Sequence, residues 1–299
     1  MSKLKAKDPE EVKQGKAKGL LFGASGVGKT WFSLTFPRPY YIDTEGGADG
    51  VEYQKRLKAA GGAYMGPEEG ALDLSAIVTE MQSLATEKHN YGTLVIDSIT
   101  KVYQTCIANE AERLAERDVF GASKKPAIAQ MRRLVNWCMK LDMNIWFIAH
   151  ETSEWGTNPR TGQREETGKC PDVWEKLVYE LDLGLRVIKR GTVYPPTAIV
   201  YKTRLAGFPD QETFSLDYEE FSKRYGRESI ESNVNPITIA SDEDVEEIER
   251  MVALLKITPE ETTKVLTKAG ADNWNELTAD QAAKTIEWLN GKLKGGKKK

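Results

Sequence analysis

The stretch Lys18–Trp31 reads KGLLFGASGVGKTW, and it decides the fold. It fills the pattern G-x-x-x-x-G-K-[ST] with Gly23, Gly28, Lys29 and Thr30, directly after a short apolar run that predicts a buried strand. Glycines let the backbone turn tightly, so that successive N–H groups point into one concavity that suits an anionic phosphate. The stretch therefore predicts a phosphate-binding loop between a strand and a helix, and with it a nucleoside triphosphate site.

The residues of this loop are expected to share the task of holding ATP. The start of the following helix faces the anion with its positive end. The Lys29 amine can reach the β- and γ-phosphates, and the Thr30 hydroxyl can ligate Mg²⁺. The predicted nucleotide-binding residues are Gly23, Ala24, Ser25, Gly26, Val27, Gly28, Lys29, Thr30 and Trp31.

Composition excludes several classes of protein. No apolar run approaches the roughly 20 residues that a membrane-spanning helix needs, and the polar N-terminal residues contain no apolar signal core. Cys106, Cys138 and Cys170 are widely spaced and include no C-x-x-C pair, which argues against a disulfide framework and a zinc site. We therefore expect a cytoplasmic α/β protein without a membrane partner.

Two further short strands are predicted to end in acidic residues. Tyr40–Asp43 is followed by Thr44 and Glu45, and Thr93–Asp97 reads TLVID. Ligands of parallel α/β sheets lie beyond the carboxyl ends of the strands, so Asp43 and Glu45 are expected beside the γ-phosphate, where a carboxylate can activate water. An acidic turn that faces solvent explains the pair equally well. Asp97 matches the Walker B pattern and is expected to support Mg²⁺.

A third buried strand, Asn144–Ala149, ends at His150. A polar side chain at this strand end can sense the γ-phosphate, although a histidine that is simply hydrogen-bonded there is an equally good interpretation. Farther along the chain, Lys202 and Arg204 share one side of a predicted strand. They suit a cationic clamp on phosphate, whereas spacing alone favours ordinary exposed strand charges.

Two polar segments are candidates for contact with nucleic acid. Glu151–Asp172 is long and rich in Gly, Thr and Pro, which predicts a functional or disordered loop, with a β-hairpin as the alternative. Its cations and one aromatic residue, Trp155, suit phosphate contact and base stacking, but it also contains four glutamates. Asp118–Pro126 is the second predicted loop. The candidate DNA-binding residues are Lys124, Lys125, Arg160, Arg164 and Lys169.

The remaining chain divides around the core predicted for residues 18–227. Residues 1–17 are expected to form a flexible basic arm, and 228–240 a linker. Residues 241–293 predict a domain of three short helices, because Thr258 and Thr278 each open a capping box and apolar residues recur at helical spacing. Residues 294–299 form a basic tail. The C-terminal domain shows no catalytic constellation and is expected to bind a partner or a DNA end.

The order of these motifs resembles the RecA-like recombinase ATPases, particularly the short phage-encoded RecA-like proteins associated with single-strand annealing. The resemblance covers about residues 18–215 and implies a mostly parallel sheet flanked by helices. It implies that Glu45 activates the hydrolytic water and that His150, at a position where RecA usually has Gln, couples nucleotide state to the following loop. It further implies that the two polar loops line single-stranded DNA and that Lys202 and Arg204 reach the ATP of a neighbouring subunit.

The sequence thus predicts an ATP- and Mg²⁺-dependent ATPase that binds single-stranded DNA and acts in recombination or strand annealing. The expected partners are DNA, further copies of the chain in a filament or ring, and a single-stranded-DNA-binding protein or other recombination protein at the C-terminal domain, in a bacterial host cell if the chain is phage-encoded. Three alternatives use the same core: a ring-forming helicase or packaging motor, a nucleotide-gated binding module, and a small-molecule kinase. The kinase ranks low because residues 151–172 contain just two arginines among many acids.

Overall fold

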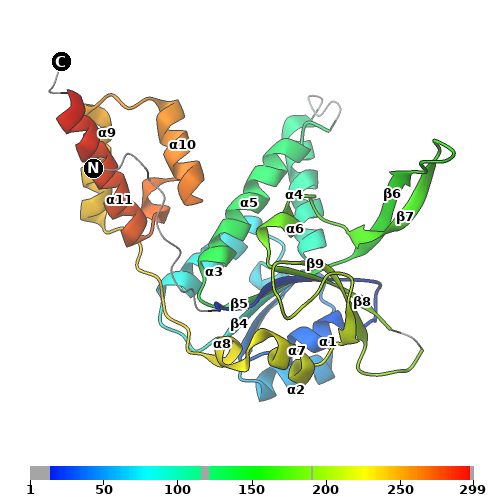
Figure 1. The fold of residues 1–299 in the computed structure, drawn as a ribbon. Helices are drawn as coiled ribbons and strands as arrows, with labels where there is room; N and C mark the ends of the chain where they lie inside the picture. Colours follow the sequence, from blue (N-terminus) through cyan, green and yellow to red (C-terminus); the bar gives the residue numbers. More distant parts are fainter. Residues whose placement is uncertain (1–13, 116–120, 190, 297–299) are drawn as a thin grey trace.

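Eight strands form the central sheet of the computed structural model, which describes residues 14–115, 121–189 and 191–296 (Figure 1). Their order is β10-β9-β8-β1-β5-β4-β2-β3, and neighbouring strands are parallel except in the pairs β8–β9 and β9–β10. The strands are β1 (Lys18–Phe22), β2 (Pro39–Asp43), β3 (Ala63–Met65), β4 (Thr93–Asp97), β5 (Asn144–Ala149), β8 (Leu183–Ile188), β9 (Thr197–Thr203) and β10 (Thr213–Ser215). Strand β1, which leads into the phosphate loop, therefore lies near the middle of the sheet.

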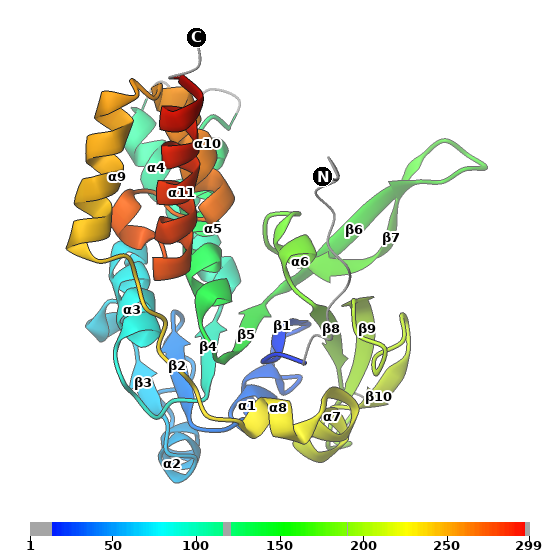
Figure 2. The same cartoon turned by 60° about the vertical axis from the view of Figure 1, so that its left-hand side comes forward.

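Helices cover both faces of this sheet because its central strands are apolar on both sides. In β1, Leu20 and Phe22 belong to one buried cluster and Leu21 to the other, as alternation along a strand requires. The helices over the first face are α3 (Leu74–Thr86), α4 (Ile99–Leu114), α5 (Lys124–Lys140) and α6 (Leu177–Glu180). Those over the second are α1 (Lys29–Ser33), α2 (Val51–Ala59), α7 (Tyr218–Tyr225) and α8 (Arg227–Glu231) (Figure 2). The predicted α/β core with a mostly parallel sheet is confirmed.

The polar segment after His150 is a two-stranded antiparallel hairpin, β6 (Glu151–Thr157) and β7 (Arg164–Pro171), which projects away from the sheet (Figures 1 and 2). The prediction of a structureless loop was wrong, and the alternative was correct. The tip is built locally, since the Asn158 carboxamide oxygen accepts hydrogen bonds from the backbone N–H groups of Arg160 (2.8 Å) and Thr161 (3.3 Å). A ribbon that is polar on both faces needs no apolar pattern, which is why periodicity did not reveal it.

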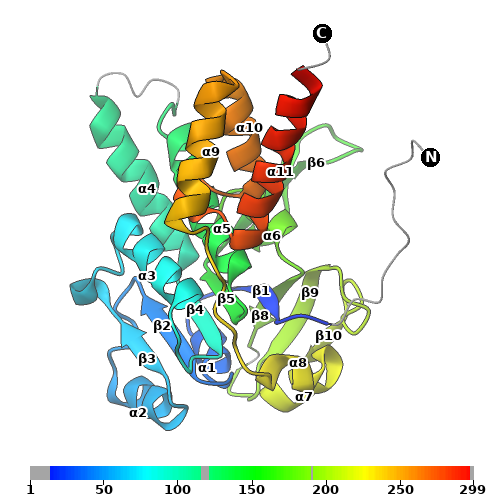
Figure 3. The same cartoon turned by 90° about the vertical axis from the view of Figure 1, so that its left-hand side faces the viewer.

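The C-terminal segment consists of α9 (Asp242–Leu254), α10 (Pro259–Ala269), a 3₁₀ turn η3 (Trp274–Glu276) and α11 (Ala279–Gly296), so the predicted helices are present. The Thr258 hydroxyl accepts a hydrogen bond from the Glu261 N–H, as the capping box predicted. The segment has its own apolar cluster and lies beside α5 (Figure 3). Arg133 of α5 joins the two parts through Glu276 (2.5 Å) and Asp272 (2.9 Å).

Several predicted boundaries shift. Lys124 and Lys125 begin helix α5 instead of lying in the preceding loop, because the helix starts four residues earlier than its apolar pattern. The expected linker from residue 228 begins as α8, whose Ile230 is buried in the core. Of the predicted N-terminal arm, residues 1–13 lie outside the described residues, whereas Ala17 is buried. Within the described ranges, no helix has the length and hydrophobicity of a membrane span.

Candidate active site

The phosphate loop joins β1 to α1 at the carboxyl edge of the sheet. Gly23 must be glycine, because a Cβ there would lie 2.3 Å from the carbonyl oxygen of Val187, and Gly28 adopts a φ of +101°. The Lys29 amine donates hydrogen bonds to the carbonyl oxygens of Gly23 and Ala24, each at 2.8 Å. Burial lowers the pKa of this amine. Lys29 is therefore folded back onto its own loop, from which it can extend toward a phosphate.

The two predicted magnesium residues lie in direct contact. The Thr30 hydroxyl donates a hydrogen bond to the Asp97 carboxylate at 2.6 Å, and the hydroxyl of Tyr41 in β2 donates to the same oxygen at 2.5 Å. Burial raises the pKa of Asp97, and these two hydrogen bonds oppose the shift. Sequence reasoning missed Tyr41. The signal was its position in β2, which pairs with the strand that ends at Asp97.

Asp43 has a different role from the one expected of it. Its side chain is almost fully buried, and its carboxylate accepts hydrogen bonds from the N–H groups of Glu45 (3.1 Å), Gly47 (3.3 Å) and Ala48 (2.7 Å). Although Asp43 lines the same cavity as Lys29, its carboxylate oxygens are taken up by this turn. Asp43 thus shapes the turn that presents Glu45.

The Glu45 carboxylate is contacted by residues that follow two strands, Ser98 after β4 and His150 after β5. Its Oε1 accepts a hydrogen bond from the Ser98 hydroxyl at 2.5 Å and lies 2.8 Å from Nε2 of His150. Glu45, Asp97, Lys29 and His150 all line one cavity of about 590 Å³. The structure therefore brings together the predicted residues that lie at or beyond the carboxyl ends of β1, β2, β4 and β5.

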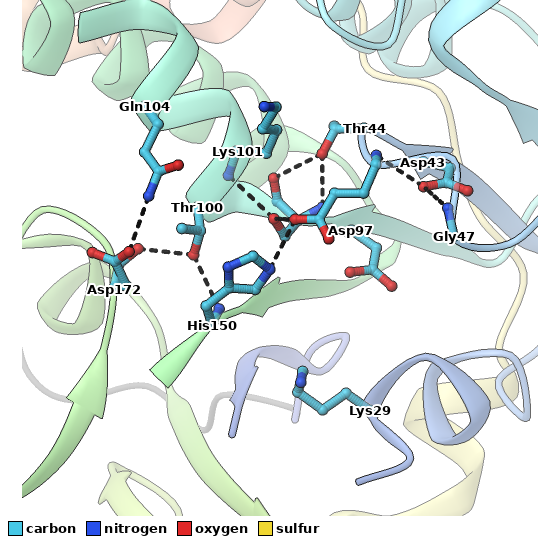
Figure 4. A network of polar contacts seen from close by, with 12 residues as sticks. Lys29, Asp43, Thr44, Gly47, Asp97, Thr100, Lys101, Gln104, His150 and Asp172 are labelled. Carbon is cyan, nitrogen blue, oxygen red and sulfur yellow. Dashed lines mark hydrogen bonds and ion pairs between the residues drawn. The ribbon is translucent and has the colours of Figure 1, made fainter. Parts of the chain in front are cut away.

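A chain of hydrogen bonds leads from this cavity to the base of the β6–β7 hairpin. The His150 N–H donates to the Thr100 hydroxyl (3.0 Å), which donates to the carbonyl oxygen of Asp172 (2.8 Å). The Asp172 N–H returns a bond to the His150 carbonyl oxygen (2.9 Å), and Gln104 donates to the Asp172 carboxylate (3.1 Å) (Figure 4). His150 and Asp172 flank the hairpin, so these hydrogen bonds connect both ends of the hairpin to the carboxyl edge of the sheet.

Lys202 and Arg204 lie at the opposite edge of the sheet. Strand β9 runs antiparallel to β8, so Thr197 pairs with Ile188 near the phosphate loop and Thr203 pairs with Leu183 at the far end. The Lys202 amine donates to the carbonyl oxygen of Leu181, and the Arg204 guanidinium donates to that of Tyr179. The structure thus keeps both cations away from the phosphate loop of their own chain. In their place, the β8–β9 turn contributes Lys189 and Tyr194 to the cavity, two residues that sequence reasoning missed.

The candidate DNA-binding residues fall into two groups. Arg160, Arg164 and Lys169 belong to the hairpin, where Lys169 pairs with Glu166 (2.6 Å) and Arg164 lies over the Trp155 ring. Lys124 and Lys125 instead line a groove of about 920 Å³ between α4, α5 and the segment around α6. Sequence reasoning missed the other polar and aromatic residues of this groove, which are Arg132, Lys176, Gln104, Asp172, Glu175, Tyr103 and Trp174.

Comparisons with known proteins place this geometry in context. Residues 15–213 match the AAA domain family. The chain has weak similarity to the solved structure of the RadB recombinase, with 18% identity and a TM-score of 0.43 over 67% of this chain and 87% of that one. It is similar at 14% identity and a TM-score of 0.35 to a KaiC-like protein from the archaeon Pyrococcus horikoshii OT3, over 68% and 93%. No curated protein matches the sequence.

Proposed function

The chain belongs to the AAA domain family, and from this premise we propose that it is an ATP-dependent, single-stranded-DNA-binding ATPase that acts in recombination or strand annealing. The membership supports the RecA-like ATPase core that the order of motifs predicted. One observation carries the proposed activity: Lys29, the Thr30–Asp97 pair and Glu45 share one cavity at the carboxyl edge of the sheet. Phosphoryl transfer to water is mostly positioning and charge stabilisation, and this set of groups supplies both.

ATP and Mg²⁺ fit the residues present. The Thr30 hydroxyl and the Asp97 carboxylate are oxygen ligands 2.6 Å apart, of the kind that Mg²⁺ prefers. Gly26 and Gly28 adopt positive φ values of 74° and 101°, the conformation of a tight turn whose N–H groups can face an anion. When bound, Mg²⁺ would neutralise charge on the phosphate oxygens. Lys29 would exchange its bonds to the Gly23 and Ala24 carbonyl oxygens for bonds to phosphate, which keeps its buried amine paired.

Glu45 is the proposed general base. Its side chain is about one-third exposed to the cavity, and its neighbour Thr44 is locked to the end of β4, since the Thr44 hydroxyl accepts a hydrogen bond from the Ser98 N–H (2.9 Å). A carboxylate at this edge can accept a proton from the attacking water while Lys29 stabilises the transferring phosphoryl group. Asp97 is occupied by Thr30 and Tyr41, so Glu45 is the better candidate for the proton.

The groove beside α5 is the proposed path of single-stranded DNA. Lys124, Lys125, Arg132 and Lys176 are all exposed there, and none has an ion-pair partner among the described residues. Tyr103 and Trp174 lie against each other at its wall, with ring centroids 6.2 Å apart. The Trp174 Nε1 is buried without a hydrogen-bond partner in the described part of the chain. Cations along a groove with aromatic rings suit a phosphate backbone with stacked bases.

Nucleotide and DNA would communicate through His150. The imidazole lies on the Glu45 carboxylate, while the His150 backbone is bonded through Thr100 to Asp172, which lines the proposed DNA groove. A change in the position of Glu45 on ATP binding would therefore reach the groove through two packed residues. Lys202 and Arg204 would act on the ATP of a neighbouring copy in a filament or ring, because they face away from their own site.

Steady-state ATP turnover of the Glu45→Gln variant tests the enzyme assignment. We expect the rate to fall by about 100-fold or more, since a general base contributes roughly 10²–10⁴. The matched control is Glu52→Gln, which alters an exposed carboxylate paired with Lys55 on α2 and should leave the rate unchanged. Unchanged turnover in Glu45→Gln would instead favour a nucleotide-gated binding module in which Glu45 has no chemical role.

Binding of a labelled single-stranded oligonucleotide over a range of salt concentrations tests the groove. The Lys124→Ala/Lys125→Ala double variant should bind more weakly, and the slope of log K against log salt should fall by about 0.7 for each phosphate that the protein no longer neutralises. Lys55→Ala/Lys58→Ala, which removes two exposed lysines of α2 over the other face of the sheet, serves as the control. An equal weakening in both double variants would mean that binding follows overall charge and would exclude the groove.

A further inference from the structure

The hydroxyl of Ser98 makes two hydrogen bonds at the end of β4. Ser98 is fully buried and is the N-cap residue of α4, where its hydroxyl oxygen accepts a hydrogen bond from the Lys101 N–H at 3.1 Å. The same hydroxyl lies 2.5 Å from Oε1 of Glu45. A serine hydroxyl has a single hydrogen to donate. Because the Lys101 N–H already uses the oxygen as an acceptor, that hydrogen points to Glu45.

The backbone of Ser98 is held on both sides. Its N–H donates to the Thr44 hydroxyl (2.9 Å), and that hydroxyl donates in turn to the Ser98 carbonyl oxygen (3.2 Å). Thr44 directly precedes Glu45 in the chain, and its N–H donates to the carbonyl oxygen of Asp97 at 2.7 Å. The hydroxyl of Ser98 and the backbone of Glu45 are therefore fixed relative to each other by the ends of two neighbouring strands.

The two oxygens of the Glu45 carboxylate have different surroundings. Ser98 and His150 both bond Oε1, whereas no group in the described part of the chain bonds Oε2. The two partners differ in burial, since the His150 side chain is 50% exposed and Ser98 is completely enclosed. His150 can leave the carboxylate without crossing packed atoms, while Ser98 cannot. Ser98 is thus the permanent contact that decides which oxygen faces inward.

We propose that Ser98 is a positioning residue for the hydrolytic reaction: by holding Oε1 of Glu45, it leaves Oε2 turned toward the cavity to accept the proton of the attacking water. The proposal rests on the proposed ATPase function. It assigns no bond between Ser98 and nucleotide, so Ser98 acts through Glu45. A carboxylate free to rotate would spend much of its time with neither oxygen aligned for proton transfer, and misplacement of this kind costs rate and not affinity.

The test is a double-mutant cycle in ATP turnover. Ser98→Ala should lower kcat by about tenfold or more while the KM for ATP stays within about twofold of wild type. In the Glu45→Gln background the same substitution should cause no further loss, since the carboxylate that Ser98 orients is already gone. Ser98→Thr, which keeps the hydroxyl, should recover most of the rate.

A purely structural role predicts different results. If Ser98 serves only as the cap of α4, the losses from Ser98→Ala and Glu45→Gln will multiply, which overturns the proposal. Ser241→Ala is the matched control, because Ser241 caps α9 through the same kind of bond (3.1 Å from the Asp244 N–H) far from the site, and it should leave kcat unchanged. Should Ser98→Ala fail to fold, Thr44→Val loosens the same strand-end lock and should show the same lack of additivity with Glu45→Gln.

The outcomes also distinguish a failure of the role proposed for Ser98 from a failure of the proposed ATPase function. A wild-type protein that hydrolyses ATP together with a Ser98→Ala variant of equal kcat overturns the role of Ser98 and leaves the ATPase standing. A wild-type protein without turnover in the presence of ATP, Mg²⁺ and single-stranded DNA overturns both. A tenfold loss that vanishes in the Glu45→Gln background supports both.

Discussion

The carboxyl ends and the amino ends of the parallel strands form two opposite edges of the central sheet. The polar residues at these two edges are held in different ways. At the carboxyl edge, the functional side chains bond one another: Thr30 bonds Asp97, and Ser98 bonds Glu45. At the opposite edge, Lys202 and Arg204 bond the backbone carbonyl oxygens of Leu181 and Tyr179. One edge is thus an assembled site within a single chain, and the other presents cations that lie away from the phosphate loop of their own chain.

This difference indicates which contributions to ATP turnover a single chain can make alone and which require a second copy. The carboxyl edge contains the groups proposed to bind ATP and activate water, so its contribution should not depend on protein concentration. A role of the opposite edge in catalysis requires a second copy, because the length of β9 separates Lys202 from the phosphate loop of its own chain. Each prediction below tests one side of this contrast.

Among the tests of this contrast, loss of Lys29 is expected to have the largest effect. Lys29→Ala removes the cation that would stabilise the transferring phosphoryl group, and turnover should fall by about 10²–10³-fold, as when one preorganised electrostatic donor is removed. Steady-state ATPase assays over a range of protein concentrations should show the same loss throughout. A loss confined to high concentration would mean that the carboxyl edge is not complete within one chain.

Arg204→Ala should lower turnover by about 10- to 100-fold, but only at concentrations where the protein self-associates, because a cation supplied in trans accelerates phosphoryl transfer. The decisive measurement mixes Arg204→Ala with Lys29→Ala. The first variant has an intact phosphate loop and the second an intact cationic edge, so a mixed interface should recover activity. Lys223→Ala, which removes an exposed lysine of α7, replaces Arg204→Ala in the control mixture. A mixture no more active than its components would remove the opposite edge from the mechanism.

The buried negative charge of Asp97 should lower the free energy of unfolding when no metal is bound. Burial raises the pKa of Asp97 in the folded state above its value of about 3.9 in the unfolded chain. At any pH between the unfolded and the folded pKa, the folded state therefore holds the proton more tightly than the unfolded state does. The free energy of unfolding therefore falls as pH rises through this window. At neutral pH with chelator, Asp97→Asn should be more stable than wild type by about 1 kcal/mol, or roughly 2–4 °C in Tm.

Thermal unfolding followed by circular dichroism at several pH values checks this expectation. The gain from Asp97→Asn should shrink as the pH approaches the pKa of the unfolded carboxyl group. Asp182→Asn provides the contrast at the opposite edge, where the carboxylate is about one-third exposed and lies 3.7 Å from Arg204. It should give no gain. Equal stabilisation by both substitutions would mean that overall charge, and not burial at the site, decides the result.

Most of the carboxyl edge could be predicted from sequence because each of its residues follows a short apolar strand. Glu45, Asp97 and His150 lie at or just after strand ends, and Lys29 begins the helix that follows the loop after β1. Parallel strands bring their carboxyl ends to one edge whatever the loops do. Contacts between side chains could not be predicted in this way. The bond of Tyr41 to Asp97 and that of Ser98 to Glu45 depend on rotamers and on register between strands, which no spacing in a single segment encodes.

Segments without an apolar pattern were predicted least well. The hairpin of β6 and β7 buries almost nothing along most of its length, so its residues show neither helical nor strand periodicity. The groove beside α5 combines residues of three separate elements, and only Lys124 and Lys125 stood out as a charged pair in the sequence. Lys189 was hidden for the same reason, because its neighbour in space is the phosphate loop, distant along the chain.

The smallest expected effect tests how the carboxyl edge is connected to the hairpin. Thr100→Val keeps the shape of a fully buried side chain but removes the hydroxyl that bonds the His150 N–H and the Asp172 carbonyl oxygen. ATP turnover without DNA should change little. Stimulation of turnover by single-stranded DNA should fall about two- to fivefold, the scale of a coupling energy near 0.5–1 kcal/mol.

Thr93→Val is the matched control, because it removes another buried threonine hydroxyl, one that bonds the Pro37 carbonyl oxygen (3.0 Å) at the start of β4, away from the path through Thr100, and it should not affect stimulation. Thr100→Val leaves two partly buried backbone groups short of one partner each, so stability should fall by about 1 kcal/mol whether or not coupling is abolished. Stability alone therefore cannot decide the matter, and the ratio of turnover with and without DNA must be compared at a temperature where both variants are folded. An unchanged ratio in Thr100→Val would mean that the carboxyl edge and the hairpin function independently, although hydrogen bonds join them.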